Sequence, residues 1–267
     1  MKFALRGRAA YAYTGGKHFD PALPCVVFIH GALHDHSVWT LLARYFAHHG
    51  RSVLAVDLPG HGRSEGPPLA DVEALGSWIL ELLGAAGVPT AALVGHSMGS
   101  LIALEAAAQQ PLRCERLVMV GTAWPMKVSE QLLNTSRDQP QAAMAMVNAF
   151  SHTTLAAKPA VPGPGTWLHG ANLALMERMQ ASGAPHGNLF LHDFQVCDRY
   201  EAASAAAQRL KAAAHLILGT RDAMTPPKSA RQLQELLNAQ VQTVTAGHAL
   251  MAEAPEALLT ALKAALA

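Results

Sequence analysis

The chain has 267 residues, of which 51% are hydrophobic and 15% are charged, and its formal net charge is +1. This length and composition predict a compact globular fold and exclude a disordered chain. Because the net charge is near zero and the Lys and Arg residues are scattered, nucleic acid and anionic membrane surfaces are excluded as the main binding partners.

Three widely spaced cysteines, Cys25, Cys114 and Cys197, form no C-x-x-C pair. An odd number at such spacings argues against a disulfide framework and against a structural zinc site. We therefore expect reduced thiols and a cytoplasmic location. The N-terminus carries charges at Lys2 and Arg6, and no apolar stretch of signal-peptide length follows them.

The apolar segments of the chain predict the strands of one sheet. Residues 2–6 and 9–14 flank Gly7 and indicate an antiparallel hairpin at one edge. Six later segments are nearly continuous apolar runs, which are typical of parallel strands that helices cover on both faces. These runs lie at residues 25–30, 52–57, 91–95, 116–120, 215–219 and 241–244.

Segments rich in Ala and Leu predict helices between these strands, at residues 38–49, 71–86, 97–109, 227–238 and 255–266. Strands that alternate with helices predict an α/β fold, with a mostly parallel central sheet and helices on both faces. Residues 82–104 contain no Asp, Glu, Lys or Arg and are long enough to span a membrane. Pro89 and several glycines divide this stretch into helix, strand and helix, so we expect no membrane segment.

The alternation of strands and helices stops between residues 125 and 200. Helix-like stretches at residues 128–134, 141–150 and 167–182 surround a Pro/Gly-rich loop at residues 158–165. We therefore predict a core made of residues 1–124 and 201–267, with a helical cap inserted at residues 125–200.

Ser97 stands in a G-x-S-x-G motif at residues 95–99, after a predicted strand and before a predicted helix. In this context a serine is exposed as a nucleophile above the edge of the sheet. Flanking glycines relieve crowding at the sharp turn, and the helix N-terminus stabilises developing negative charge. We predict Ser97 as the nucleophile; the alternative is a turn of small residues that packs helix against strand.

A serine nucleophile needs a base, and the base needs an acid that orients it. His248 follows the last predicted strand and Asp222 follows the strand before it, so both are expected at the same sheet edge as Ser97. The order Ser, Asp, His is the one expected for this arrangement. The other position for the acid, after residues 116–120, offers no carboxylate. The alternatives are that His248 is a loop histidine without a partner and that Asp222 caps a helix or a turn.

Five motifs occur in a fixed order along the chain: His30-Gly31, D-L-P-G-H-G-R-S at residues 57–64, G-H-S-M-G at 95–99, G-T-R-D at 219–222 and Gly247-His248. Together they resemble the α/β-hydrolase superfamily, and within it the serine esterase, C–C hydrolase and haloperoxidase-like group. The resemblance covers nearly the whole chain and implies the fold and the triad Ser97, His248 and Asp222. The predicted cap resembles no family that we can name.

The resemblance also implies an oxyanion hole. One donor is the backbone N–H of Met98, directly after the nucleophile. The other is the N–H of Ala32, after the His-Gly pair, with Leu33 as a near alternative. Loss of one such donor typically costs about 10²–10³ in rate.

The predicted cap is rich in Met and Phe and carries few charges, which favours an acyl or aromatic substrate. The same side chains are equally explained as the core of the insertion. His96 is alternatively a partner in hydrogen bonds of the turn. With these alternatives open, the predicted substrate-binding residues are Leu33, His96, Trp124, Met144 and Phe150.

Other motifs argue against a metal and against a cofactor. The His34-Asp35-His36 run lacks further ligands at metal-site spacings. Residues 60–65 miss the third glycine of a dinucleotide fingerprint, and the sequence has no phosphate-binding loop. We expect no metal and no cofactor, and we expect Asp57 and His61 to shape a turn.

We therefore predict a serine hydrolase of the carboxylesterase type, which cleaves an ester-like bond in a small, largely apolar molecule through an acyl-enzyme. The partner is a small-molecule substrate, with neither nucleic acid nor membrane, and the protein is a monomer or a homodimer. The same triad also suits a C–C bond hydrolase or a cofactor-free perhydrolase. A ligand receptor on this scaffold is the alternative of another class. Dehalogenases and epoxide hydrolases are disfavoured because they carry Asp at the position of Ser97.

Overall fold

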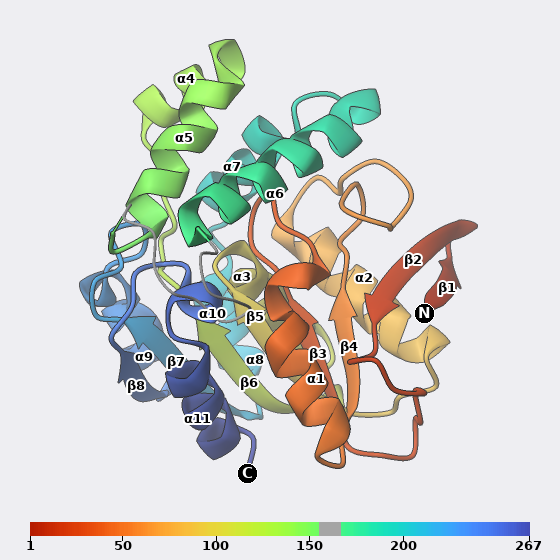
Figure 1. The fold of residues 1–267 in the computed structure, drawn as a ribbon. Helices are drawn as coiled ribbons and strands as arrows, with labels where there is room; N and C mark the ends of the chain where they lie inside the picture. The colour runs from red at the N-terminus through yellow and green to blue at the C-terminus, as the bar shows by residue number, and fades with distance from the viewer. Residues whose placement is uncertain (155–166) are drawn as a thin grey trace.

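The computed structural model describes residues 1–154 and 167–267. Within these ranges, eight strands form one sheet in the order β1-β2-β4-β3-β5-β6-β7-β8 (Figure 1). The β1–β2 and β2–β4 pairs are antiparallel, and the other neighbours run parallel. The predicted α/β fold class is confirmed. The strands are β1 (Lys2–Leu5), β2 (Arg8–Tyr13), β3 (Cys25–Ile29), β4 (Ser52–Val56), β5 (Ala91–His96), β6 (Cys114–Val120), β7 (Ala213–Gly219) and β8 (Gln240–Val244).

Alternate residues of each central strand belong to two different cores. On β3, Val27 and Ile29 face one core, whereas Val26 and Phe28 face the other. Both faces of the sheet are therefore covered, which explains why the apolar runs are continuous. The first core packs against α2 (Val72–Ala85), α3 (Met98–Gln109), α8 (Ala203–Arg209) and α9 (Arg231–Leu237). The second packs against α1 (Thr40–His48), α10 (Leu250–Glu253) and α11 (Pro255–Ala265).

Four helices lie above the carboxyl ends of the parallel strands (Figure 1). These upper helices are α4 (Glu130–Asp138), α5 (Pro140–Ser151), α6 (Leu168–Gly183) and α7 (Leu189–Arg199). Their apolar side chains form a third core that extends down to Leu33, next to the carboxyl end of β3. The first three correspond to predicted helical stretches. The predicted loop at residues 158–165 lies outside the described residues.

The uncharged stretch at residues 82–104 divides as predicted, into the end of α2, a turn, β5 and the start of α3. Among the described residues, no helix is both long enough and apolar enough to cross a membrane.

Three helices of the described residues were not predicted: α7, α8 and the short α10. The sequence from 189 to 199 mixes His, Asp and Gln with Leu and Phe, yet Leu189, Phe190 and Phe194 of α7 are buried in the third core. The side chain of Asn188 caps this helix by accepting a hydrogen bond from the N–H of Leu191 at 3.0 Å. In addition, the predicted helix at residues 227–238 is a 3₁₀ turn, Pro227–Ala230, followed by α9.

Candidate active site

Ser97 occupies the sharp turn between β5 and α3. Its backbone has φ +53° and ψ −121°, a conformation that residues other than glycine rarely adopt. The N–H of Ser97 donates to the carbonyl oxygen of Val120 on β6 at 2.9 Å, and the carbonyl of Ser97 accepts a hydrogen bond from the hydroxyl of Ser100. These contacts hold the turn, and Ser97 lines a cavity beneath the upper helices.

Close backbone packing explains the two glycines of the motif. A Cβ atom at Gly95 would lie 2.0 Å from the carbonyl oxygen of Gly99, and one at Gly99 would lie 2.4 Å from the carbonyl oxygen of Ile29. The end of β3 therefore rests directly on the first turn of α3, and neither position has room for a side chain.

We expect Gly99→Ala to destabilise the protein by about 1–3 kcal/mol, because the new methyl group must displace the backbone of β3. Thermal denaturation measures this effect. Gly84→Ala is the matched control, since Gly84 lies in α2 and a Cβ there has open space within 4 Å. The control should raise the melting temperature slightly, as alanine is the better helix former. Equal melting temperatures for the two variants would contradict the packing argument.

Asp222 and His248 meet through their side chains in the loops that follow β7 and β8. The Nδ1 atom of His248 lies 2.8 Å from Oδ2 of Asp222. Oδ1 of Asp222 accepts hydrogen bonds from the N–H groups of Met224 and Thr225, both at 2.8 Å. The hydroxyl of Thr225 donates to Oδ2 of Asp222 at 2.8 Å and lies 3.1 Å from Nδ1 of His248.

This arrangement sets the protonation of the pair. Burial alone would raise the pKa of Asp222, but the charge of His248 and the hydrogen bonds from His248 and Thr225 outweigh it and lower that pKa. Asp222 is therefore an acceptor only, and Nδ1 of His248 donates the proton of their hydrogen bond. The lone pair is then on Nε2, the atom that a general base uses.

The loop that carries His248 is bound to its surroundings on both sides. The N–H of Gly247 donates to Oε2 of Glu253 at 2.6 Å, and Oε1 of Glu253 accepts from the N–H of Thr153 at 2.9 Å. The N–H of Ala249 donates to the carbonyl oxygen of Ser151 at the end of α5. The position of His248 is thus linked to that of the upper helices.

The backbone N–H groups of Met98 and Ala32 are the predicted oxyanion donors. Met98 is the first residue of α3, so the helix itself does not use its N–H. Ala32 lies in the turn after β3 and lines the same cavity as Ser97. The N–H of Leu33, the alternative donor, is already used, because it donates to Oδ2 of Asp193 at 2.8 Å. The structure therefore favours Ala32 over Leu33.

Asp193 also forms a buried ion pair with His61. Nε2 of His61 lies 2.9 Å from Oδ2 of Asp193, and each side chain is 2% exposed. Burial disfavours the charge on each residue. The charge of the partner and the hydrogen bond between them outweigh burial, so the pKa of His61 is raised and the pKa of Asp193 is lowered.

This pair predicts a pH dependence of stability. A raised pKa of His61 in the folded protein gives stability that is present below about pH 6.5 and is lost as the pH rises through the folded value. The lowered pKa of Asp193 gives stability that is present above about pH 4 and is lost as the pH falls. Two further titratable groups face His61: the charge of Asp57 raises its pKa, and the ring of His30 lies at a tilt to its ring, with the centroids 5.0 Å apart.

We therefore expect the advantage of the wild type over Asp193→Asn in free energy of unfolding to shrink between pH 6 and pH 9. Urea denaturation at several pH values measures it. The comparison cancels the histidines common to both proteins. An advantage that stays constant over this range would show that His61 is neutral in the folded protein.

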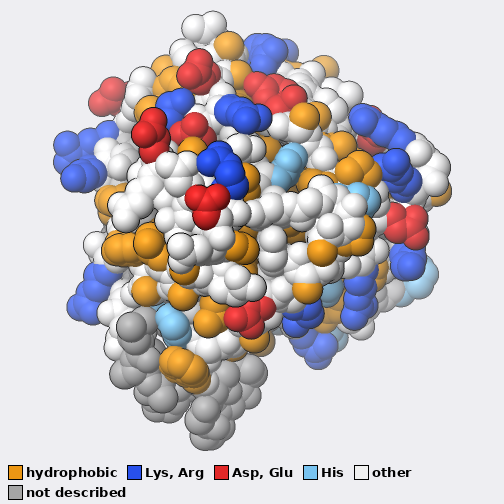
Figure 2. Space-filling model, turned by 90° about the horizontal axis from the view of Figure 1, so that it is seen from above, with side chains coloured by type: hydrophobic (Ala, Val, Ile, Leu, Met, Phe, Trp, Pro, Cys, Tyr) orange, Lys and Arg blue, Asp and Glu red, His pale blue; other side chains and the backbone are white. Residues whose placement is uncertain are grey.

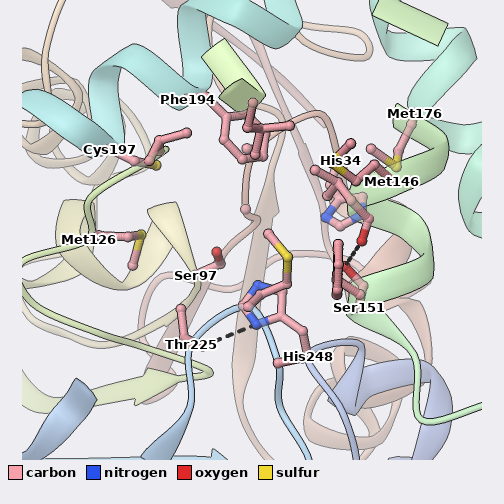
Figure 3. A pocket seen from close by; sticks show the side chains of 18 of the residues that line it. His34, Ser97, Met126, Met146, Ser151, Met176, Phe194, Cys197, Thr225 and His248 are labelled. Carbon is pink, nitrogen blue, oxygen red and sulfur yellow. Dashed lines mark hydrogen bonds between the residues drawn. The ribbon is translucent and has the colours of Figure 1, made fainter. Parts of the chain in front are cut away.

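Two cavities adjoin the candidate catalytic residues. One, of about 400 Å³, is lined by Ser97, His248 and mainly apolar side chains of α4, α5, α6 and α7. Figure 3 shows Ser97 beside Met126 and His248 in this cavity, with Met176 and Phe194 around its other walls. The second, of about 360 Å³, lies next to α1, α6 and α10. His34, His96, Ser151, Asn172 and His248 line both.

The predicted substrate-binding residues divide into two groups. His96 and Phe150 line the first cavity, as does Ala32. Leu33, Met144 and Trp124 line neither of the two cavities, so the structure does not support those three assignments. Leu33 and Met144 are fully buried in the third core, and Trp124 packs against the first core.

The two histidines on the wall between the cavities are neutral. Burial lowers the pKa of His34 to about 4, although its hydrogen bond to Oδ1 of Asn172 at 2.9 Å opposes the shift. Burial also lowers the pKa of His96, and the nearby charge of His248 lowers it further. Nε2 of His96 donates to the carbonyl oxygen of His248 at 2.9 Å, so this residue also supports the turn, which was the alternative expectation.

The comparison with known sequences agrees with this geometry. A profile of the alpha/beta hydrolase fold matches residues 24–255, which is most of the chain. The chain belongs to the α/β-hydrolase family. The predicted family resemblance is thereby confirmed, and with it the assignment of this chain as a hydrolase.

Curated relatives of this hydrolase match only in part. The sn-1-specific diacylglycerol lipase ABHD11 of Mus musculus is 40% identical over 102 residues, which are 38% of this chain and 33% of the relative. The 2-succinyl-6-hydroxy-2,4-cyclohexadiene-1-carboxylate synthase of Escherichia coli O1:K1 is 32% identical over 129 residues, 48% of this chain and 50% of the relative. The match therefore spans half or less of the length of these relatives.

Solved structures match the hydrolase over its full length. The enol-lactonase of Burkholderia xenovorans LB400 has a TM-score of 0.80 at 20% identity, and it covers 100% of this chain and 99% of its own. The esterase EaEST of Exiguobacterium antarcticum has a TM-score of 0.81 at 16% identity. The match covers 99% of this chain and 98% of the esterase chain. At these identities the likeness concerns the fold alone.

One cluster of this hydrolase has the residue types of a metal site. Ligand atoms of Asp35, His36 and Asp57 lie within 4.8 Å of one another. Oδ1 of Asp57 accepts hydrogen bonds from the N–H and Nδ1 of His36, and Oδ2 accepts from the N–H of Arg63. Asp35 caps the turn at Ser37 and pairs with Arg178. These hydrogen bonds give the carboxylates a structural role, so we assign no ion to them.

Thr225, Asp193 and Glu253 hold parts of the site by hydrogen bonds and were not predicted. Thr225 follows Asp222 by three residues, a spacing typical of a side chain that closes a turn, and this signal could have identified it. Asp193 and Glu253 carry no such signal. Asp193 binds a residue 160 positions away, and Glu253 binds one 100 positions away, so folding alone brings these pairs together.

Proposed function

We propose that this hydrolase is a serine carboxylesterase that cleaves an ester-like bond through an acyl-enzyme. The observation that carries the proposal is the pairing of His248 with Asp222, which directs the basic Nε2 atom of His248 away from Asp222. His248 and Ser97 line the same cavity.

In the proposed mechanism, His248 takes the proton of the Ser97 hydroxyl as the oxygen attacks the carbonyl carbon of the substrate. Asp222 stabilises the imidazolium that forms. The N–H groups of Met98 and Ala32 stabilise the oxyanion, and His248 then returns the proton to the leaving alcohol. Water, activated by His248, releases the acid. The reaction written in this way uses no cofactor and no metal.

The lining of the first cavity supports a small, largely apolar substrate. Its volume lies within the range of about 300–1,000 Å³ that is usual for small-molecule sites. On the face seen from above, positive and negative side chains are interspersed with apolar ones (Figure 2). Because neither sign of charge dominates there, this face does not attract a strongly charged ligand. The apolar side chains that line the cavity include Met126, Leu132, Met146, Phe150, Met176 and Phe194.

In this proposal the upper helices act as a cap, within the insertion predicted at residues 125–200. They supply most of the apolar lining, whereas the core supplies the nucleophile, the base and the oxyanion donors. One relative is named as a diacylglycerol lipase, which supports an apolar acyl group in the substrate proposed here.

Hydrolysis of p-nitrophenyl esters from acetate to decanoate tests the proposal. We expect turnover that increases with acyl length until the chain fills the cavity and then falls. A fluorophosphonate probe should add one adduct to the peptide that contains Ser97, as shown by mass spectrometry. Failure of both the turnover and the labelling would contradict the proposed esterase.

A C–C bond hydrolase is the second candidate, and one observation favours it. The neutral His34 and Asn172 add polar groups to the lining of the cavity, and such groups would suit a substrate with additional carbonyl oxygens. Labelling of Ser97 together with turnover of a vinylogous diketone, in preference to any ester, would select this reaction. Slow single turnover with a retained ligand would instead indicate a receptor.

A further inference from the structure

Leu33 adopts an unusual backbone conformation in the loop that follows β3. Its φ is +55°, in the left-handed region that favours glycine. Such a conformation persists only where the surrounding contacts hold it. Two contacts do so: the side chain of Leu33 is fully buried in the third core, and its N–H donates to Asp193 on α7.

Both peptide groups that flank Ala32 are held by hydrogen bonds. The first contains the carbonyl oxygen of Gly31, which lies 2.8 Å from Nδ1 of His30. The second contains the N–H of Leu33, which lies 2.8 Å from Oδ2 of Asp193. Because a peptide group is planar, holding the carbonyl of Gly31 also sets the direction of the N–H of Ala32. The proposed oxyanion donor is therefore oriented from two sides.

The charges around this loop are mutually consistent. Nδ1 of His61 lies 3.1 Å from the carbonyl oxygen of Pro59, and its Nε2 lies 2.9 Å from Asp193. Both neighbours are acceptors, so both nitrogens of His61 donate and the ring is positively charged. His30, whose ring centroid is 5.0 Å from that of His61, must then stay neutral, because its Nε2 accepts from the N–H of Leu58 at 3.1 Å.

We propose that Asp193 is a positioning residue that holds the oxyanion loop in its working conformation from the upper helices. This rests on the proposed function, in which the N–H of Ala32 stabilises the oxyanion. Asp193 lies on α7 between Phe190 and Phe194, which anchor that helix in the third core. The position of α7 and the orientation of the Ala32 N–H are therefore linked. In this proposal the upper helices contribute to catalysis in addition to covering the substrate.

Asp193→Asn tests the proposal, since it removes the charge with little change in shape. We expect kcat for a p-nitrophenyl ester to fall about 10- to 100-fold, which is less than the loss caused by deleting an oxyanion donor, because the N–H of Ala32 is misoriented but still present. KM should change by less than about twofold. Affinity for a boronic acid, which forms a tetrahedral anion on Ser97, should fall by the same factor as kcat. Unchanged kcat, or a loss confined to KM, would overturn the proposal.

Asp198→Asn is the matched control. Asp198 lies on the same helix and accepts the N–H of Val128 at 2.9 Å, so the substitution removes the same charge from α7 without touching the oxyanion loop. Its kcat should stay within about twofold of the wild type. An equal loss of kcat in both variants would show a general effect of loosening α7, and would overturn a specific role of Asp193.

Two further measurements keep the proposal independent of folding and of esterase activity. Asp193→Asn alone leaves the His61 cation buried without its carboxylate partner, whereas the double variant Asp193→Asn/His61→Gln removes both charges. A loss of kcat that persists in the double variant is therefore not caused by an unpaired His61. Amide hydrogen exchange of residues 31–33 should be faster in Asp193→Asn than in the wild type. If the wild type hydrolyses no ester, the proposed function fails; unchanged exchange at Leu33 would overturn the role of Asp193.

Discussion

Replacement of Ser97 by alanine should lower kcat for a p-nitrophenyl ester by at least about 10⁴-fold, with binding of the substrate nearly unchanged. The hydroxyl is the atom that the mechanism adds to the carbonyl carbon, and no other group in the proposed mechanism can form the acyl-enzyme. What remains is the residual rate that the oxyanion donors and substrate positioning supply to direct attack by water. Steady-state kinetics together with loss of fluorophosphonate labelling measure this effect.

Ser136→Ala is the control for Ser97→Ala. Ser136 is buried in α4, where its hydroxyl donates to the carbonyl oxygen of Leu133 at 2.8 Å, and it lines neither of the two cavities. This variant should keep its activity within a few-fold. Should Ser97→Ala retain more than about a tenth of the wild-type kcat, the assignment of the nucleophile is wrong.

Asp222→Asn should lower kcat by about 10⁴-fold, although the shape of the side chain hardly changes. The N–H groups of Met224 and Thr225 both point at Oδ1, so the amide oxygen of Asn must occupy that position. The amide nitrogen then faces Nδ1 of His248 and donates to it. The proton of His248 moves to Nε2, and the ring can no longer accept the proton of Ser97.

Thr225→Val provides a graded comparison for Asp222→Asn. It removes a hydroxyl that contacts both Asp222 and His248 but leaves their hydrogen bond intact. Loss of one such hydrogen bond is worth about 1 kcal/mol, so kcat should fall by only about fivefold. If the two variants lose activity equally, the charge and orientation of Asp222 are not what activates His248.

The architecture followed from patterns that are local in the sequence. Continuous apolar runs predict strands buried on both faces, and the helices α1, α2 and α3 follow from Ala- and Leu-rich segments between them. The turn at Ser97 was equally accessible, because Gly95 and Gly99 are required by backbone contacts within a few residues or with the adjacent strand. Loops after parallel strands share one edge of a sheet, so the sequence alone predicts that Asp222 and His248 lie at the same edge as Ser97.

Side-chain roles above the sheet could not be obtained in this way. Leu33 and Met144 were predicted to contact the substrate, but they are buried in the core of the upper helices. An apolar residue packs equally well against a ligand or against a neighbouring helix, and its identity does not distinguish the two surroundings. The same ambiguity left α7 unpredicted, since its polar residues mask the apolar face that the third core requires.

The amino-acid order therefore determines the sheet, the turn at Ser97 and the position of Asp222 and His248 at one edge of the sheet. Each depends on neighbours along the chain or on the general geometry of parallel strands. The hydrogen bond that occupies the N–H of Leu33, and so leaves Ala32 as the candidate oxyanion donor, is made with Asp193, which is 160 positions away. The attachment of the His248 loop depends on Glu253 and Thr153, 100 positions apart. Contacts between buried polar groups so distant in the chain exist only after the helices have packed, when each carboxylate must find donors to offset its burial.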